Sequence, residues 1–234
     1  MSKFKETFQN KHVILPVVHV ENPTQAIRNT QVAKDTGCDG VFLIDMKNGA
    51  HYEELLEIHG KVRKEFPDFW IGVNFLDLET EDVFDKLNSG IDGVWVDNAK
   101  INNTLSEQAD AKVISQKRKD SKWDGLYFGG VAFKYQEEST NPAKDAQIAR
   151  DFMDVVTTSG IGTASAPDIQ KISSMKNAIG DFPLAIASGI SPENVKKFLP
   201  ITDCFLTASS LLIPRTQNFD KRRVSAFVDT IRNA

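Results

Sequence analysis

The stretch "DGVFLIDM", residues Asp39–Met46, is a short run in which apolar side chains follow one another without alternating with polar ones. Strands buried on both faces have this pattern, and they are typical of parallel sheets. Seven more runs of this kind are His12–Val20, Phe69–Phe75, Asp92–Asn98, Gly125–Phe133, Asp154–Gly160, Pro183–Gly189 and Asp203–Ser210. The stretch therefore predicts one of eight strands in a parallel sheet.

Helical segments are predicted between these runs. Asn22, Asn141 and Ser191 each precede a proline, which is the order of a helix cap and a first helical residue. Eight βα units in 234 residues predict an α/β fold, a single (β/α)8 TIM barrel forming one domain over residues 1–234. A doubly wound open sheet is the alternative, but the turn "HVENPT" after the first run lacks a glycine-rich nucleotide motif.

Composition and charge limit the classes of partner that we expect for this chain. The net charge is −4 and no basic patch dominates, so nucleic acid is not an expected partner. No uncharged apolar run reaches about 18 residues, and the first residues lack the apolar core of a secretory signal. Cys38 and Cys204 are far apart and form no ligand motif. We expect a cytoplasmic protein without membrane insertion, and we leave a homo-oligomer open.

Active sites of such barrels lie at the carboxyl ends of the strands. The catalytic candidates there are Asp45, Asp97, Lys134, Asn74 and His19. The two aspartates end the second and fourth runs and could divide acid and base roles, hold hydroxyl groups or bind a divalent metal. Alternatively, they pair with neighbouring lysines or cap helices. No resident cofactor is expected, and a divalent metal stays open.

The other three candidates have roles of their own. Asn74 could orient a substrate between the two carboxylates, and Lys134 could bind phosphate or stabilise an oxyanion. A Schiff base at Lys134 is the less favoured alternative, as is a merely solvated lysine. His19 could titrate near neutral pH, or it could be a hydrogen-bonded histidine at the edge of the core.

Phosphate binding is predicted at the last two loops. Ser188 and Gly189 precede the Ser191-Pro192 helix start, and Ala208 and Ser209 follow the eighth run. Loops after the seventh and eighth strands are the usual phosphate site of barrels. The residues Ser159, Gly160, Gly162 and Thr163 belong to the end of the sixth run and the loop after it, and they are expected to form a wall of the same site. Small residues are also common in any tight turn, so a purely structural role is the alternative.

At these residues the sequence resembles the BtpA/SgcQ family of phosphate-binding (β/α)8 barrels. The matching pieces are "IGVNFL" (Ile71–Leu76), "VVTTSGIGTASAPD" (Val155–Asp168), "ASGISPENVKKFL" (Ala187–Leu199), "DCFLTASSL" (Asp203–Leu211) and "NFDKRRVSAFV" (Asn218–Val228). The chain departs from the family at Asp45-Met46, Lys134-Tyr135 and Thr207-Ala208-Ser209, where members have Glu-Asn, Lys-His and Gly-Thr-Ser. The resemblance implies a short, divergent member with its site at the barrel mouth, and it brings no settled chemistry.

Three functions remain in competition. The first is an enzyme acting on a small phosphorylated metabolite, sugar-phosphate or nucleotide-like, with isomerase, lyase and hydrolase chemistry all open. The second is a non-catalytic assembly or binding factor built on the barrel, favoured by the missing histidine after Lys134. The third is a metal-dependent hydrolase that uses Asp45 and Asp97.

Overall fold

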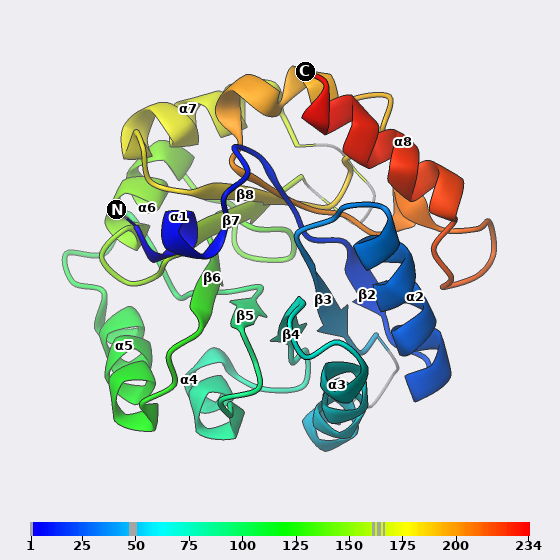
Figure 1. Cartoon of the computed structure of the whole chain (residues 1–234). Helices are drawn as coiled ribbons and strands as arrows, with labels where there is room; N and C mark the ends of the chain where they lie inside the picture. The colour runs from blue at the N-terminus through cyan, green and yellow to red at the C-terminus, as the bar shows by residue number, and fades with distance from the viewer. Residues whose placement is uncertain (1, 47–50, 161, 163–164, 166) are drawn as a thin grey trace.

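The structure, a computed structural model, describes residues 2–46, 51–160, 162, 165 and 167–234. Over these residues it shows an α/β fold in which nine parallel strands form a curled sheet (Figure 1). The strands are β1 (Val13–Ile14), β2 (Val17–His19), β3 (Gly40–Ile44), β4 (Trp70–Asn74), β5 (Gly93–Val96), β6 (Leu126–Gly130), β7 (Val155–Ser159), β8 (Leu184–Ala187) and β9 (Cys204–Leu206). Every predicted run thus contains a strand.

Nine strands replace the eight predicted ones because the first run is divided. Its two pieces, β1 and β2, are separated by Leu15 and Pro16, and proline has no N–H to continue the ladder. The sheet order is β1-β9-β8-β7-β6-β5-β4-β3-β2. The two ends of this order are therefore pieces of one chain segment, and the backbone N–H of Val17 in β2 still donates to Thr207 O at 2.9 Å.

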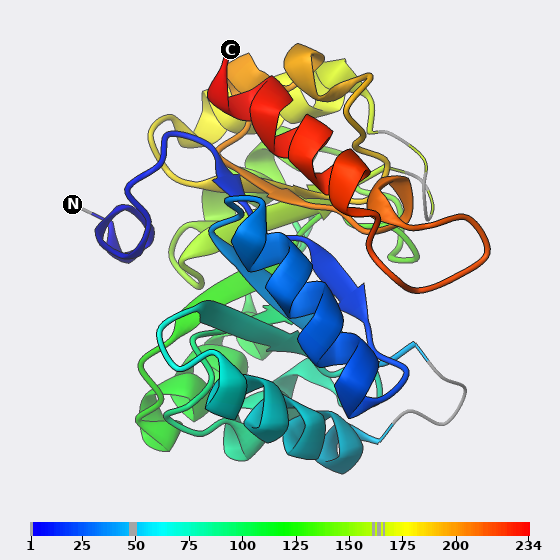
Figure 2. The same cartoon turned by 45° about the vertical axis from the view of Figure 1, so that its right-hand side comes forward.

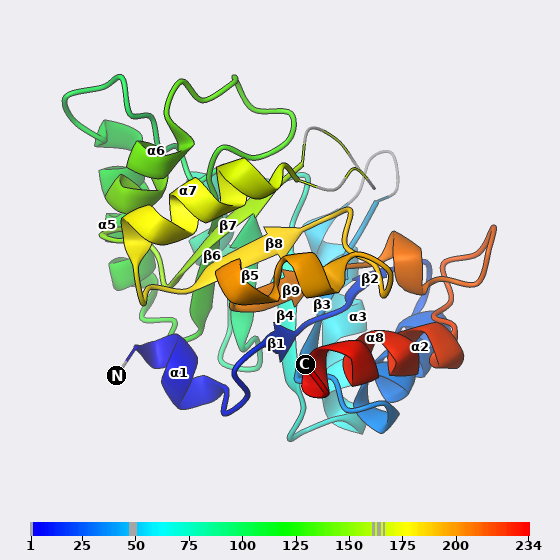
Figure 3. The ribbon, with the colours of Figure 1, turned by 90° about the horizontal axis from the view of Figure 1, so that it is seen from above.

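All but the first of the helices cover the outer side of the sheet, whereas the first adds side chains to the core inside it. Within the described residues they are α1 (Lys3–Thr7), α2 (Pro23–Asp35), α3 (Tyr52–Glu65), α4 (Thr80–Val83), α5 (Ala109–Ser121), α6 (Pro142–Ala149), α7 (Ile169–Ile179) and α8 (Lys221–Arg232). Helices α2 and α8 lie side by side (Figure 2), and so do α6 and α7 (Figure 3). Short 3-10 turns are η1 (Phe84–Lys86), η2 (Val195–Lys197), η3 (Leu199–Ile201) and η4 (Ser209–Leu211).

The caps explain where these helices begin, and one prediction is wrong. Asn22 and Asn141 accept hydrogen bonds from Gln25 N and Lys144 N and cap α2 and α6, as the sequence predicts. Ser191-Pro192 does not open an α-helix, since only the 3-10 turns η2 and η3 follow β8. The side chain of Asn194 folds back there, accepting from Ser191 N at 2.9 Å and donating to Gly189 O at 2.8 Å.

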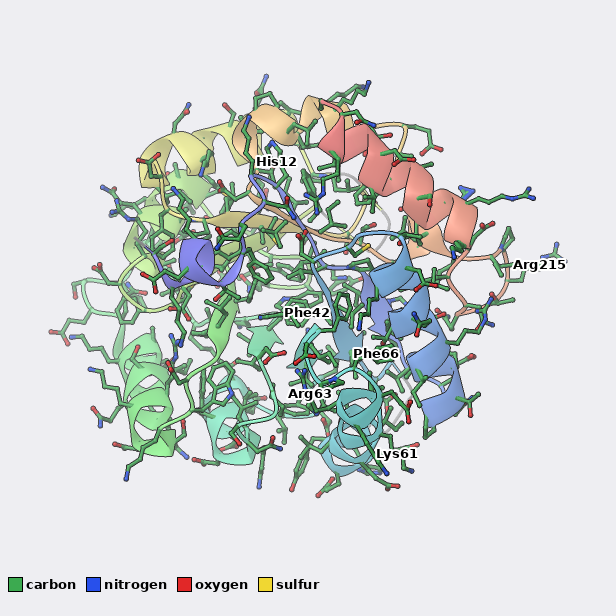
Figure 4. All side chains as sticks on the ribbon, viewed as in Figure 1. His12, Phe42, Lys61, Arg63, Phe66 and Arg215 are labelled. Atoms are coloured by element: carbon green, nitrogen blue, oxygen red, sulfur yellow. The ribbon has the colours of Figure 1, made fainter. Side chains whose placement is uncertain are left out.

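The inside of the curled sheet has its own hydrophobic core. Phe42 lies near its centre (Figure 4), and its ring packs edge-to-face against Trp70, Trp95 and Phe128 at centroid distances of 5.1, 5.9 and 5.2 Å. The helix α1 adds Phe4, whose ring lies 6.3 Å from that of Phe128. A second and larger core fills the space between sheet and helices. Aromatic packing thus closes the amino-terminal end of the interior and leaves polar residues for the other end.

Four aspartates tie the sheet together at the amino ends of alternate strands. They are Asp39, Asp92, Asp154 and Asp203, directly before β3, β5, β7 and β9. Each accepts a hydrogen bond from a strand N–H, those of Ile14, Ile71, Tyr127 and Leu184, at 2.7, 2.7, 2.7 and 2.8 Å. Each also pairs with a base on a helix, in turn Arg232, Arg63, Arg118 and Lys176. We call these four residues the aspartate clamps.

Replacing Asp154 with alanine is expected to lower the free energy of unfolding by about 2–3 kcal/mol. The change leaves Tyr127 N–H and the Arg118 guanidinium without this acceptor in a part-buried place. Urea unfolding followed by circular dichroism measures the effect. The control is Asp151→Ala, an exposed site expected to change stability by less than about 0.5 kcal/mol. Equal effects of the two changes would show that the clamp has no special role.

Candidate active site

A cavity of about 720 Å³ lies at the carboxyl ends of the strands. Residues in or just after β2, β3, β4, β5, β6, β8 and β9 line it: Val17, His19, Ile44, Met46, Leu76, Trp95, Asp97, Lys134, Tyr135, Ser188, Gly189, Ile190, Ser191, Asn194, Leu206, Thr207, Ala208, Ser209 and Ser210. The parallel strands bring these side chains together because their carboxyl ends all point to the same end of the sheet. This is the end at which the sequence predicts the site.

Asp97 is the carboxylate of this cavity. It follows β5, and its Oδ1 accepts a hydrogen bond from Asn74 Nδ2 on β4 at 3.1 Å. Burial raises the pKa of Asp97, although the Asn74 hydrogen bond and the charge of Lys134 act in the opposite direction. A carboxyl group that keeps its proton to higher pH is suited to proton transfer.

Lys134 joins the β6 end of the cavity to the β8 end. Its ammonium lies 3.2 Å from Ser188 Oγ, and its backbone N–H donates to Ser159 Oγ at 2.8 Å. Ser159 is buried and donates in turn to Gly160 O at 2.9 Å. Within the described residues, Ser159 therefore positions the backbone of Lys134 and does not line the cavity.

The backbone is strained where it meets the cavity. Ser188 has a φ of 76° and Tyr135 a φ of 64°, the left-handed region that side chains other than glycine rarely adopt. Gly189 follows Ser188 with a φ of 70°. The N–H groups of Gly189 and Ser209 donate to no described residue. Such strain and such unused donors gather at ligand sites.

His19 is the last residue of β2, and its surroundings favour the uncharged imidazole. Burial lowers its pKa, and the charge of Lys134 adds to that effect, whereas a hydrogen bond to Gln217 opposes it. The His19 Nδ1 lies 3.1 Å from Gln217 Oε1. Because the amide oxygen only accepts, Nδ1 carries the proton and Nε2 is free of one, so the imidazole can act as a base.

Gln217 itself is held by α2. Its backbone carbonyl accepts from Gln25 Nε2 at 2.8 Å and from Asn29 Nδ2 at 2.7 Å. Both donors are buried, so the loop that carries Gln217 is fixed against the helix. Gln217 cannot be found from the sequence, because it lies 198 positions from His19 in a stretch without a motif.

Replacing Gln217 with glutamate is expected to raise the pKa of His19 by about one unit or more. A carboxylate in the place of the amide oxygen adds an opposite charge beside the imidazolium. In the natural protein the pKa of His19 is lower in the folded state than in the unfolded chain. The unfolded chain therefore binds the proton more readily, and stability is lost as the pH falls below about 6.5. The variant should weaken that loss. NMR titration of the histidine ring measures the shift, and an unchanged pKa would contradict the contact.

Lys171 is a second residue that the sequence analysis misses. It lies on α7, and its ammonium donates to Ala132 O at 2.5 Å and to Ser159 O at 2.9 Å. Burial lowers its pKa to about 8 against the opposing charge of Asp168. Lys171 thus joins the chain after β6, which carries Lys134, to the end of β7.

The remaining candidates are placed as follows. Ser188, Gly189, Ala208 and Ser209 line the cavity, as do His19, Asp97 and Lys134. Asp45 is buried and Asn74 contacts Asp97, but neither is among the lining residues. Gly160 and Gly162 are not among them either, and Thr163 lies outside the described residues. Over the described part of the chain, no three histidine, cysteine or acidic side chains are grouped to hold a metal ion.

The family match covers only the part of the chain that follows β6. The BtpA family model covers the chain from the residue after β6 to the end of α8. Residues 131–233 match the BtpA family. The BtpA match confirms the resemblance read from the sequence and includes Lys134, Ser188 and Ser209. His19, Asn74 and Asp97 lie before the matched residues.

Several solved structures share the fold of this chain at low sequence identity. The chain superposes on (S)-3-O-geranylgeranylglyceryl phosphate synthase from Thermoplasma acidophilum with a TM-score of 0.69 and 13% identity, over 100% of both chains. Tryptophan synthase subunit alpha from Legionella pneumophila gives 0.70 and 12%, also over 100% of both. Phosphoribosyl anthranilate isomerase from Thermotoga maritima gives 0.65 and 15%, over 96% of this chain and 100% of that one. At identities of 12–15%, these similarities show that the chain shares their fold.

No curated protein matches the sequence. None of the helices in the described residues combines the length and the apolar character needed to cross a bilayer.

Proposed function

We propose that the protein is an enzyme that performs acid–base chemistry on a small phosphorylated metabolite. The site is the cavity at the carboxyl ends of the strands, in a single domain whose sheet closes as a (β/α)8 barrel through the segment of β1 and β2. One observation carries the proposal: a single cavity holds the Lys134–Ser188 contact and the half-buried carboxyl of Asp97.

The phosphate is assigned to the ends of β8 and β9. Lys134 supplies a positive charge beside Ser188 Oγ, and Gly189 and Ser209 supply N–H groups that donate to no described residue. An ammonium, a hydroxyl and backbone amides are the donors that phosphate oxygens accept from. The left-handed backbone at Gly189 has no side chain to keep a ligand away.

Proton transfer is assigned to Asp97 and His19. Their environments move the two pKa values toward each other's range, since burial raises that of Asp97 and lowers that of His19. Near neutral pH His19 is therefore a neutral base, and Asp97 exchanges its proton more readily than an exposed aspartate. Asn74 orients the Asp97 carboxyl.

The neighbours support the substrate class in general terms. The geranylgeranylglyceryl phosphate synthase structure contains its substrate sn-glycerol-1-phosphate, and another neighbour is a phosphoribosyl anthranilate isomerase. A metal-dependent hydrolase is supported less well, because Asp97 lines the cavity and Asp45 does not. A non-catalytic binding factor is the outcome to accept if the cavity binds phosphate but no acid–base variant changes any turnover.

Inorganic phosphate binding, measured by isothermal titration calorimetry, tests the anion half of the proposal. We expect Lys134→Met to weaken binding by about tenfold or more, because the charge-assisted contact is lost. Lys100→Met is the control, since that ammonium pairs with Glu79 and is not among the residues lining the cavity. No phosphate binding, or equal binding by both variants, would reject the site.

A further inference from the structure

The cavity has two walls of different chemistry. One wall, at the ends of β8 and β9, presents the hydroxyl side chains of Ser188, Thr207, Ser209 and Ser210 beside the apolar Ile190, Leu206 and Ala208. The other wall is apolar and comes from β2 to β5. Its residues are Val17, Ile44, Met46, Leu76 and Trp95, which we call the apolar wall. A phosphate uses the first wall and leaves the second unexplained.

The apolar wall continues to the open mouth. The side chain of Met46 is 51% exposed and that of Leu76 is 42% exposed, so both are among the most exposed large apolar residues of the described chain. Tyr135, at the β6 side of the cavity, is 79% exposed. Apolar side chains gathered around a cavity mouth indicate that an apolar group of a ligand covers them.

Trp95 lies deeper in the apolar wall. It is 4% exposed, and its ring packs between Phe42 and Phe133 at 5.9 Å from each. Its indole N–H is buried and has no hydrogen-bond partner among the described residues. That N–H has almost no accessible surface, so Trp95 contributes apolar surface to this wall and no hydrogen bond.

The volume agrees with a ligand larger than a phosphate. At about 720 Å³ the cavity falls within the range of roughly 300–1,000 Å³ that is typical of sites for drug-sized molecules. A phosphate bound at Ser188 and Gly189 fills only a small part of it. The apolar wall borders part of the remaining space.

We propose that the substrate is a monophosphate that carries an apolar group the size of an aromatic ring, bound against Val17, Ile44, Leu76 and Trp95. The inference rests on the proposed function, which it narrows from phosphorylated metabolites in general. The phosphate binds at Ser188 and Gly189 and the ring on the apolar wall. Asp97, Lys134 and His19 line the same cavity, where they can reach the bonds that join the two parts.

Two phosphonates that differ only by a ring test this proposal. Calorimetry compares propylphosphonate with 3-phenylpropylphosphonate on the full chain. We expect the ring to tighten binding by about tenfold, the effect of burying part of a ring in an apolar site. Equal affinities, with both ligands displaced by inorganic phosphate, would overturn the apolar group and leave the proposed function standing.

Further arms separate the two claims. The alcohol 3-phenylpropanol has the ring without the anion, and we expect it to bind much more weakly. Binding as tight as that of the phosphonate would reject the phosphate site and keep the apolar wall. If neither phosphonate binds, both proposals fail.

A pair of matched variants locates the ring. Leu76→Asn should weaken 3-phenylpropylphosphonate by about three- to tenfold and leave propylphosphonate unchanged. Leu105→Asn makes the same substitution at a 55% exposed leucine that is not among the residues lining this cavity, and it should change neither affinity. Equal effects of the two variants on the ring ligand would overturn the assignment of the ring to this wall.

Discussion

Replacing Asp97 with asparagine is expected to lower the turnover of a phosphorylated substrate by about 10²- to 10⁴-fold, the usual contribution of a positioned acid or base. Asparagine has the same shape and can still accept from Asn74, so the architecture of the cavity is retained. Steady-state kinetics with a substrate identified by screening phosphate esters measures the loss. A variant with full activity would remove Asp97 from the mechanism.

The same substitution should make the protein more stable at neutral pH. Burial raises the pKa of Asp97, so ionising it costs stability as the pH rises above about 4, the value of an exposed aspartate. Asparagine has no charge to bury, and its gain should disappear at lower pH. Thermal unfolding at pH 7 and pH 3.5 measures this. A carboxylate that merely held the fold together would show the opposite sign at pH 7.

Replacing Gly130 with alanine is expected to lower the free energy of unfolding by about 3 kcal/mol and to displace Asp97. A Cβ at Gly130 would overlap the backbone carbonyl of Asp97 at the end of β5. Backbone atoms cannot move aside as a flexible side chain can, so the end of β5 must shift. Urea unfolding measures the stability, and phosphonate affinity should stay close to that of the natural protein if only the Asp97 side is disturbed.

The control for this substitution is Gly60→Ala on α3. A Cβ there meets no atom within 4 Å, and alanine in a helix is favoured over glycine by roughly 1 kcal/mol. The two glycine-to-alanine changes should therefore have opposite signs. A neutral result at Gly130 would show that the two strands can separate without cost.

The sequence predicts the strands well because their pattern is local. Runs of buried residues such as Asp39–Met46 and Asp92–Asn98 need only their own side chains to be recognised. The helix predicted at Ser191-Pro192 is wrong because a capping pair permits a helix without requiring one. Here Asn194 turns back to the chain at Ser191, and two 3-10 turns follow.

Only some residues of the candidate site can be predicted from the sequence. Residues at strand ends, such as Asp97 and Ser188, are found from the position of the strands alone. Gln217, Lys171 and Trp95 are not, because their roles depend on contacts between distant parts of the chain or on which side of a strand faces the interior. The clamps can be recognised in the sequence, because four alternate runs begin with aspartate, and those at Asp39 and Asp92 share the pattern Gly-x-Asp-Gly-Val.

The aspartate clamps also bear on how such a chain can change over generations. They lie at the amino ends of the strands, whereas the residues proposed to meet the substrate lie at the carboxyl ends. Mutations at the mouth therefore leave the clamps untouched, and most of them should cost little folding energy. Over generations, substitutions in the loops of the mouth can therefore change which ligand binds while the scaffold is retained.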